Sequence, residues 1–278
     1  MWHIILFLLC SICFADFSFA QNTIIAETVF RANRHNLHFP HISKDYTFVD
    51  LDSSYAIQKA YTEIKLRDDK ISGYKTALTS KQAQGKYSAL EPLSGVLFES
   101  GKTYSPSNIK LSDSRITLIE TELGFLVDKD IIQTIELPIE SQQSISNFIS
   151  TVVPIIELPD IGFKELDGIT AVDIISTNAG AKQFIVGRKN LIENTDINNN
   201  KIKLFRDGKL INSASSSEVM EGQISALIWL INDVISRGYE IKSGHILITG
   251  SVGKLSRATE GLYMGDFGKL GRIYFEIK

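Results

Sequence analysis

The chain of 278 residues contains almost no cysteine, because its two copies, Cys10 and Cys13, both lie close to its beginning. From residue 14 onward it therefore has no disulfide, thiolate nucleophile, zinc–cysteine site or iron–sulfur cluster of its own. A chain of this length buries a core large enough to fold without disulfide cross-links. Because a thiol-free protein cannot mispair in an oxidising compartment, this pattern is compatible with export.

An excess of one charge is also missing. The chain has 29 lysines and arginines against 32 aspartates and glutamates, a formal net charge of −3, and its basic residues are scattered. This distribution argues against a nucleic-acid partner. Hydrophobic residues make up 44% and charged residues 22%, which excludes a disordered tail, a collagen-like fibre and a coiled-coil rod. No internal repeat and no flexible linker divides the chain.

Long hydrophobic runs are absent except at the start, where residues 4–14 are apolar. This run is too short to span a bilayer comfortably and has the length of a signal-peptide core. Ser18 and Ala20 supply the small residues of a cleavage site, so Gln21 would become the N-terminus. The region before the run is weakly basic, which keeps a retained membrane anchor as the alternative. We predict a signal peptide over residues 1–20, cleaved after Ala20, and a periplasmic or secreted protein without membrane contact after cleavage.

Periodicity divides the rest of the chain into an N-terminal lead-in, residues 21–68, and a β-rich domain, residues 69–278. In the lead-in, the spacing of apolar residues predicts one helix over residues 52–67, capped by Ser53 or Ser54. In the domain, one broad apolar face predicts a late helix over residues 219–237, and short apolar segments between turn residues predict strands. The predicted strands are residues 71–78, 116–127, 152–158, 245–249 and 272–277.

Residues 21–50 are polar, and we expect them to be irregular. Three histidines, His35, His38 and His41, recur there at a spacing of three. Pro40 interrupts that spacing, and no carboxylate is placed to complete a set of metal ligands. The composition favours a surface or a partner contact over a metal site for these histidines.

Two glutamates stand in an otherwise apolar predicted strand. Residues two apart in a strand share a face, so Glu120 and Glu122 point the same way. In apolar surroundings two adjacent carboxylates repel each other and lose hydration unless a cation neutralises them. Glu157 is isolated in another apolar strand, and three carboxylates without cysteine or histidine suit a hard cation such as Mg²⁺ or Mn²⁺. The alternative is that the face with Glu120 and Glu122 lies in water.

Two further segments read Gly73-Tyr-Lys-Thr-Ala-Leu-Thr-Ser-Lys-Gln and Glu91-Pro-Leu-Ser-Gly-Val-Leu-Phe. Together with other short segments in the same order along the chain, they resemble the 2-keto-4-pentenoate hydratases of the fumarylacetoacetate hydrolase superfamily. The resemblance covers roughly residues 50–278 without a large gap. The other segments are residues 54–58, the strand with Glu120 and Glu122, and residues 154–157, 173–179, 186–187, 226–230, 243–251 and 265–271.

The resemblance implies an α+β fold, mixed and rich in β-structure, of the type of the superfamily's C-terminal domain, in a homo-oligomer. Members of the family bind Mg²⁺ or Mn²⁺ through three glutamates, which match Glu120, Glu122 and Glu157. The cation chelates the 1-carboxylate and 2-oxo group of a substrate such as 2-hydroxypenta-2,4-dienoate. It stabilises the enolate while water adds at the distal carbon.

The resemblance also places Lys75 in the active site as a catalytic residue. There it either pairs with the substrate carboxylate or assists proton transfer, and the second task needs a lowered pKa. The alternative is an ordinary surface lysine. For substrate binding, the resemblance indicates Thr79 and the segment around Ser251, which can donate hydrogen bonds to a carboxylate. Asn178 either orients a ligand or closes a turn.

Two positions depart from the family pattern. Hydratases usually carry an aspartate acid/base where this chain has Leu93, and an acidic residue is common where His245 stands. We predict a divalent-metal-dependent, hydratase-like lyase that acts on small unsaturated 2-oxo or 2-hydroxy acids. The alternatives are a decarboxylase or C–C hydrolase of the same superfamily, and a non-catalytic protein that binds 2-oxo acids. Export would be unusual, since these enzymes usually act in the cytoplasm on aromatic breakdown products.

Overall fold

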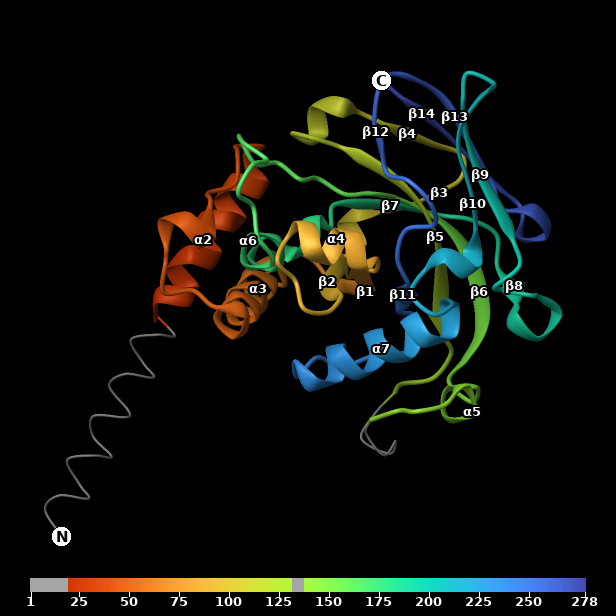
Figure 1. The fold of residues 1–278 in the computed structure, drawn as a ribbon, viewed down its shortest axis with the longest axis horizontal. Helices are drawn as coiled ribbons and strands as arrows, with labels where there is room; N and C mark the ends of the chain where they lie inside the picture. The colour runs from red at the N-terminus through yellow and green to blue at the C-terminus, as the bar shows by residue number, and fades with distance from the viewer. Residues whose placement is uncertain (1–19, 132–137) are drawn as a thin grey trace, which may run out of the picture.

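The structure is a computed structural model and describes residues 20–131 and 138–278 (Figure 1). The predicted signal peptide lies outside the described residues except for Ala20, so its cleavage stays a prediction. No described helix has both the length and the apolar character needed to cross a membrane. Figure 1 shows the helical lead-in at one end of the molecule and a small sheet at the other.

The lead-in contains more helix than the sequence predicted. Residues 20–34 are helical, and the short helix α2 (Ile42–Asp45) follows before the predicted one. The expectation that residues 21–50 are irregular is therefore wrong over much of that segment. A helical stripe of buried apolar residues is hidden there among polar ones, and its burial stabilises the helix. The stripe consists of Ile25, Ala26, Val29 and Ala32.

The predicted helix of the lead-in is confirmed as α3 (Leu51–Lys65), but its cap differs. Asp50 caps it, because the backbone N–H of Ser53 donates to Asp50 Oδ1 at 2.8 Å. The hydroxyl of Ser54 donates instead to the carbonyl of Leu51 within the helix. An aspartate immediately before a helix is as good an acceptor for these free N–H groups as a serine.

A nine-stranded sheet forms the centre of the domain, with the order β2-β1-β11-β5-β6-β7-β3; β12 also pairs with β5, and β8 with β6. The predicted strands at residues 71–78, 116–127, 152–158 and 245–249 are confirmed as β1, β5, β6 and β11. The bounds are β1 (Ile71–Ala77), β2 (Leu93–Phe98), β3 (Lys102–Tyr104), β5 (Leu118–Val127), β6 (Ile149–Leu158), β7 (Gln183–Val186), β8 (Asn190–Leu191), β11 (Ile246–Ile248) and β12 (Ser256–Arg257).

The second sheet has five strands in the order β10-β9-β13-β14-β4, and its last strand in the chain, β14, was also predicted. The bounds are β4 (Ser107–Ile109), β9 (Lys201–Arg206), β10 (Lys209–Ser215), β13 (Gly261–Asp266) and β14 (Arg272–Ile277). The predicted late helix is confirmed as α7 (Gln223–Ser236). The other short helices are α4 (Lys81–Lys86), α5 (Gln142–Ile145) and α6 (Ala171–Ser176).

The central sheet has a core on each face. On one face, α7 packs against β1, β2 and β11, and the second sheet packs against β5 and β6. The other face encloses a smaller apolar cluster, in which Leu97 of β2 joins Phe184 and Val186 of β7. Because β2 and β7 stand far apart in the strand order, this contact shows that the sheet curls until its ends meet. We call that line of contact the seam.

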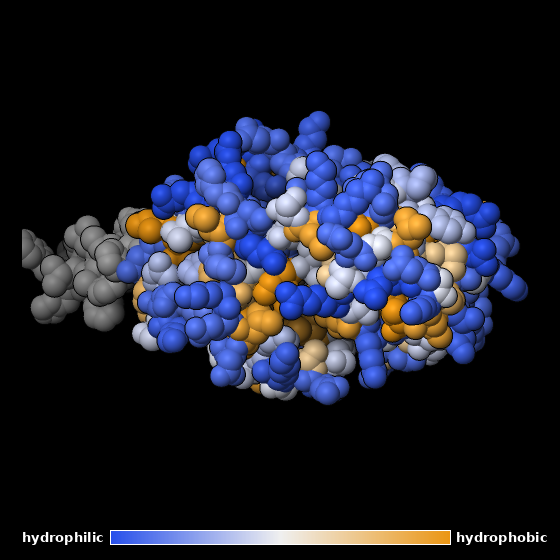
Figure 2. Space-filling view, turned by 90° about the horizontal axis from the view of Figure 1, so that it is seen from above, coloured by the Kyte–Doolittle hydropathy of each residue, from blue (hydrophilic) through white to orange (hydrophobic). Residues whose placement is uncertain are grey.

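The face of the molecule in Figure 2 is mostly polar, with apolar residues in several separate patches. Such a distribution is ordinary for a folded domain, because isolated exposed apolar side chains need no partner.

Candidate metal centre and active site

The register of β5 and β6 brings the three predicted glutamates together. The strands are antiparallel, and Glu120 stands directly opposite Glu157. Glu122 lies on the same face of β5, two residues along. One carboxylate oxygen from each residue can be chosen so that all lie within 4.8 Å of one another. Within the described parts of the chain, no other group of three histidines, cysteines or acidic residues is placed to hold a metal ion.

The cluster is buried, which contradicts the alternative of a strand face in water. Glu122 and Glu157 have no exposed surface, and Glu120 is 9% exposed. Burial, followed by repulsion from the neighbouring carboxylates, raises the pKa of Glu122 well above its usual range. Burial also raises the pKa of Glu157 to about 8, although Lys75 opposes the shift. Three carboxylates held this close in a buried site take up protons or need positive charge nearby.

Lys75 supplies part of that charge. Its Nζ lies 2.9 Å from Glu157 Oε1 and donates to Glu157 Oε2 at 3.2 Å. Lys75 is 2% exposed, so it is not a surface lysine. Burial lowers its pKa, but the carboxylates of Glu157, Glu120 and Glu122 outweigh burial, and the net pKa is raised. This direction is opposite to the lowered pKa that proton transfer by Lys75 requires, and it favours the ammonium form that pairs with Glu157.

The charges and the free oxygen atoms of the cluster suit a divalent cation. Three carboxylates and one ammonium leave two negative charges, which one divalent ion neutralises. Glu122 Oε2 accepts a hydrogen bond from the backbone N–H of Gly250 at 2.9 Å, while Glu122 Oε1 is buried without a hydrogen-bond partner among the described residues. An all-oxygen donor set of this kind is the one that Mg²⁺, Mn²⁺ and Ca²⁺ prefer.

Gly250 is a functional residue that sequence reasoning undervalued. It follows β11 with a φ of +115°, and a Cβ atom on it would lie 2.5 Å from Thr79 Cγ2. Only glycine therefore allows this loop to bring its N–H to Glu122. The signal in the sequence was a glycine directly after a buried strand, between Thr249 and Ser251.

The three residues predicted to bind substrate have different environments. Thr79 is partly exposed and packs against Gly250, so it lies close to the cluster. Ser251 follows Gly250, and its hydroxyl is buried without a hydrogen-bond partner among the described residues. The hydroxyl of Thr249, in contrast, is engaged by the Leu123 carbonyl and the Gln223 side chain. Thr79 and Ser251 remain available for a ligand.

The side chain of Asn178 bonds to the backbone of a distant strand, which is neither of the two roles considered for it. Its Oδ1 accepts from the N–H of Val96 and its Nδ2 donates to the carbonyl of Val96, both at 2.8 Å. The side chain is buried, so its carboxamide is used by the backbone of β2. Asn178 thus joins the two ends of the curled sheet at the seam, and its amide is not free to orient a ligand.

Leu93, which stands at the position of the family aspartate, lies in an apolar environment. It is 3% exposed and packs with Tyr55, Ala171 and Ile175. His245, the second departure, packs its ring against Tyr74, whose side chain is on the opposite face of β1 from Lys75. Neither position supplies an acid or base to the cluster.

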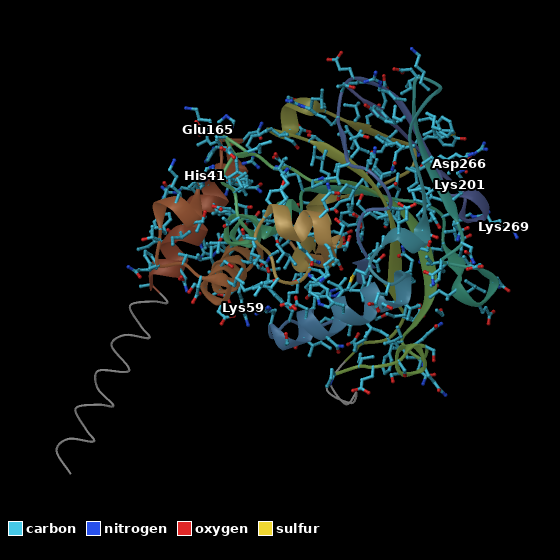
Figure 3. All side chains as sticks on the ribbon, in the orientation of Figure 1. His41, Lys59, Glu165, Lys201, Asp266 and Lys269 are labelled. Atoms are coloured by element: carbon cyan, nitrogen blue, oxygen red, sulfur yellow. The ribbon has the colours of Figure 1, made fainter. Side chains whose placement is uncertain are left out.

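The histidines of the lead-in contact a neighbouring loop instead of a metal. His41 Nε2 lies 3.0 Å from the carbonyl oxygen of Glu165, and Figure 3 shows the two residues side by side. His38 Nδ1 lies 3.3 Å from the carbonyl oxygen of Gly162. His35 and His38 are exposed, in agreement with a surface role, and the contacts of His38 and His41 lie within this chain, so a partner contact stays a prediction.

Curated relatives of the chain are hydratases. The chain is 25% identical over 260 residues to the 2-oxo-hept-4-ene-1,7-dioate hydratase of Escherichia coli, covering 91% of this chain and 96% of the relative. It is 23% identical over 244 residues to the 2-keto-4-pentenoate hydratase of Paraburkholderia xenovorans, covering 87% and 88%. No protein-family model matches the chain.

Solved structures confirm the predicted fold class. The chain superposes with a TM-score of 0.85 on the 4-oxalocrotonate decarboxylase from Pseudomonas putida G7, complexed with magnesium and adipate, at 19% identity over 93% of this chain and 98% of that one. It superposes with a TM-score of 0.51 on the fumarylpyruvate hydrolase from Pseudomonas aeruginosa, complexed with Mn²⁺ and pyruvate, at 12% identity over 73% and 88%.

Proposed function

We propose that the chain is a divalent-metal-dependent lyase of the fumarylacetoacetate hydrolase superfamily that acts on small unsaturated 2-oxo or 2-hydroxy acids. Its curated homologues are named 2-keto-4-pentenoate hydratase and 4-oxalocrotonate decarboxylase. The observation that carries the proposal is the buried cluster of Glu120, Glu122 and Glu157 with Lys75. Its named homologues are hydro-lyases.

Glu120, Glu122 and Glu157 would hold the cation, and Mg²⁺ or Mn²⁺ is the ion we propose. Similar structures contain Mg²⁺ or Mn²⁺, and the oxygen donors of this cluster suit both. When bound, the cation supplies a Lewis acid that binds the 1-carboxylate and 2-oxo oxygens of the substrate and stabilises negative charge on the 2-oxygen.

The side chains of this protein have three tasks around that centre. Lys75 holds Glu157 in place through two short contacts and lowers the repulsion among the carboxylates. Gly250 orients Glu122 through its backbone N–H. Thr79 and Ser251 lie beside this loop and would donate hydrogen bonds to the substrate carboxylate.

Hydration of a substrate such as 2-hydroxypenta-2,4-dienoate is the reaction that we propose first. Leu93 favours decarboxylation as the second candidate, because hydration needs a proton carrier and the position that usually provides one is apolar. A protein that binds 2-oxo acids without turnover is the third possibility.

The experiment is product analysis. The Mg²⁺-loaded protein is incubated with 2-hydroxypenta-2,4-dienoate and, separately, with 4-oxalocrotonate. Loss of conjugated absorbance without CO₂ supports hydration, and CO₂ release from 4-oxalocrotonate supports decarboxylation. Metal-dependent binding without either reaction identifies a non-catalytic protein. Absence of binding to both acids in the presence of Mg²⁺ contradicts the proposal.

We also propose that the protein is exported after cleavage behind Ala20 and acts outside the cytoplasm as a homo-oligomer. The support for export is the short apolar run with Ser18 and Ala20, together with the absence of cysteine from the rest of the chain. The support for the homo-oligomer is the family resemblance.

A further inference from the structure

A cavity of about 180 Å³ lies beside the seam and shares no residue with the glutamate cluster. Leu97 and Phe98 of β2 line it on one side, and residues 181–184, which lead into β7, line it on the other. Tyr61 of α3 also lines it, so helix and both ends of the sheet contribute. Its lining includes polar side chains, such as Lys182 and Gln183, and apolar ones, such as Tyr61 and Leu97.

Lys182, one of the polar residues that line the cavity, has no carboxylate partner in the described parts of the chain. Lys182 Nζ donates one hydrogen bond, to Asn33 Oδ1 at 3.3 Å, and no acidic group of the described residues lies within ion-pair distance of it. An ammonium group has three N–H donors, so two remain. Burial, and then the positive charge of Arg115, lowers the pKa of Lys182. An anion beside Lys182 would offset both effects.

Gln183, a second polar residue of the lining, has an oxygen atom without a hydrogen-bond partner in the part of the chain that the structure describes. The Oε1 atom of Gln183 is buried and has no hydrogen-bond partner among the described residues. A buried polar atom without a partner costs free energy that a ligand can recover. Because the two ends of a carboxamide exchange places by rotation, Gln183 can offer its N–H₂ to an acceptor.

The other basic residue of the cavity is already neutralised. Lys65 lies 3.0 Å from Asp69 and stands over the ring of Phe98. The cavity therefore combines one positive charge without a carboxylate partner among the described residues, from Lys182, with the apolar side chains of Tyr61 and Leu97. A ligand that matches this lining has one negative charge and a short apolar end.

We propose that this cavity binds a short-chain monocarboxylate, with its carboxylate against Lys182 and Gln183 and its alkyl end against Tyr61 and Leu97. The volume equals about six times the ~30 Å³ that a water molecule occupies, which suits an acid of about three or four carbons. The site is separate from the glutamate cluster, so it does not depend on the proposed function.

The test is calorimetric titration of the metal-free protein with propionate in the presence of EDTA. EDTA removes the cation that would hold a carboxylate at the glutamate cluster, and the Lys182 variants assign the remaining binding to the cavity. We expect saturable binding at millimolar propionate. Lys182→Met should weaken it by about tenfold or more, because a charge-assisted hydrogen bond is lost. Lys182→Arg should restore binding to within about threefold, and Lys209→Met, an exposed lysine on β10, should change nothing.

A second variant tests the cavity without touching its charge. Ala181→Leu should fill the space and abolish propionate binding without lowering the melting temperature. The proposal is overturned if the unaltered protein shows no saturable binding, or if Ala181→Leu binds propionate normally. It is also overturned if inorganic phosphate binds as tightly as propionate, because the cavity would then recognise charge alone.

Discussion

The ammonium group of Lys75 lies 2.9 Å from the carboxylate of Glu157, and this contact joins β1 to β6 across β11 and β5. Both side chains are buried, so each is the other's nearest compensating charge. One lysine cannot balance three carboxylates. The negative charge that remains in the cluster can be balanced by protons or by a divalent cation.

Glu122→Gln should weaken Mg²⁺ binding by about 100-fold or more. Mutation of residues that only hydrogen-bond to a metal ligand already lowers metal affinity or activity by about 10–100-fold, and Glu122 is proposed as a ligand itself. The metal-free protein should keep or gain stability, because one of three repelling carboxylates is removed. Calorimetric titration and melting temperature measure the two effects. Glu260→Gln, on an exposed loop, is the control. Unchanged Mg²⁺ affinity in Glu122→Gln would show that the cluster is not a metal site.

Lys75→Met should separate metal binding from activity. Removing the ammonium leaves the buried carboxylates without compensation, so the metal-free protein should lose about 3–5 kcal/mol of stability. Mg²⁺ should then raise its melting temperature by more than it raises that of the unaltered protein, because a competing positive charge is gone. Turnover should nevertheless fall, because Lys75 no longer holds Glu157 in place. A smaller stabilisation by Mg²⁺ than in the unaltered protein would contradict this account of Lys75.

Leu93→Asp should raise the hydration rate by at least about tenfold, since a positioned acid or base contributes 10²–10⁴-fold. Tyr55, Ala171 and Ile175 surround the position, so an unpaired carboxylate there should also lower the melting temperature. Leu93→Asn is the matched control, because it loses the same packing and carries no titratable proton. A folded, metal-binding Leu93→Asp variant with no gain over Leu93→Asn would place proton transfer elsewhere.

His245 should make the protein less stable in mild acid. Burial, followed by repulsion from Lys242, lowers its pKa below 6.5, and its Nδ1 accepts a hydrogen bond from the backbone N–H of Lys242 at 3.2 Å. The unfolded chain therefore binds the proton first as the pH falls. Its contribution to stability is full above about pH 6.5 and is lost as the pH drops through the folded pKa.

Urea unfolding between pH 7.5 and 5.5 measures the effect of His245. The raised carboxyl pKa values of Glu122 and Glu157 act in the opposite direction, so the difference between the two proteins is the readout. On going from pH 7.5 to 5.5, the stability of the unaltered protein relative to His245→Gln should fall. An equal change in both proteins would assign the pH dependence to other groups.

The mature N-terminus should be Gln21, because the apolar run of residues 4–14 ends in a signal-type cleavage site. Residues such as Ile25 and Val29 anchor the following helix in the core, so cleavage there leaves its buried face complete. N-terminal sequencing of the extracytoplasmic fraction checks this. An intact Met1 in the membrane fraction would establish the retained anchor instead.

The sequence by itself determined which segments form the main strands and which glutamates share a face. Both follow from local alternation, because side chains in a strand repeat every two residues whatever the partner strand is. The buried strands β5 and β6, the helix α7 and the pair Glu120 and Glu122 were therefore predictable. The buried stripe of residues 20–34 was not recognised, because its polar neighbours dominate the composition and packing alone makes it helical.

Only the tertiary structure decided what lies beside those glutamates. The register of two strands sets Glu157 opposite Glu120, and the curl of the sheet brings Lys75 and the N–H of Gly250 to the same place. The tertiary structure also places the Asn178 side chain in hydrogen bonds with the backbone of Val96. Among the described residues, it leaves Lys182 without a carboxylate partner beside a cavity. These contacts join residues far apart in the chain, and their geometry depends on how the whole core packs.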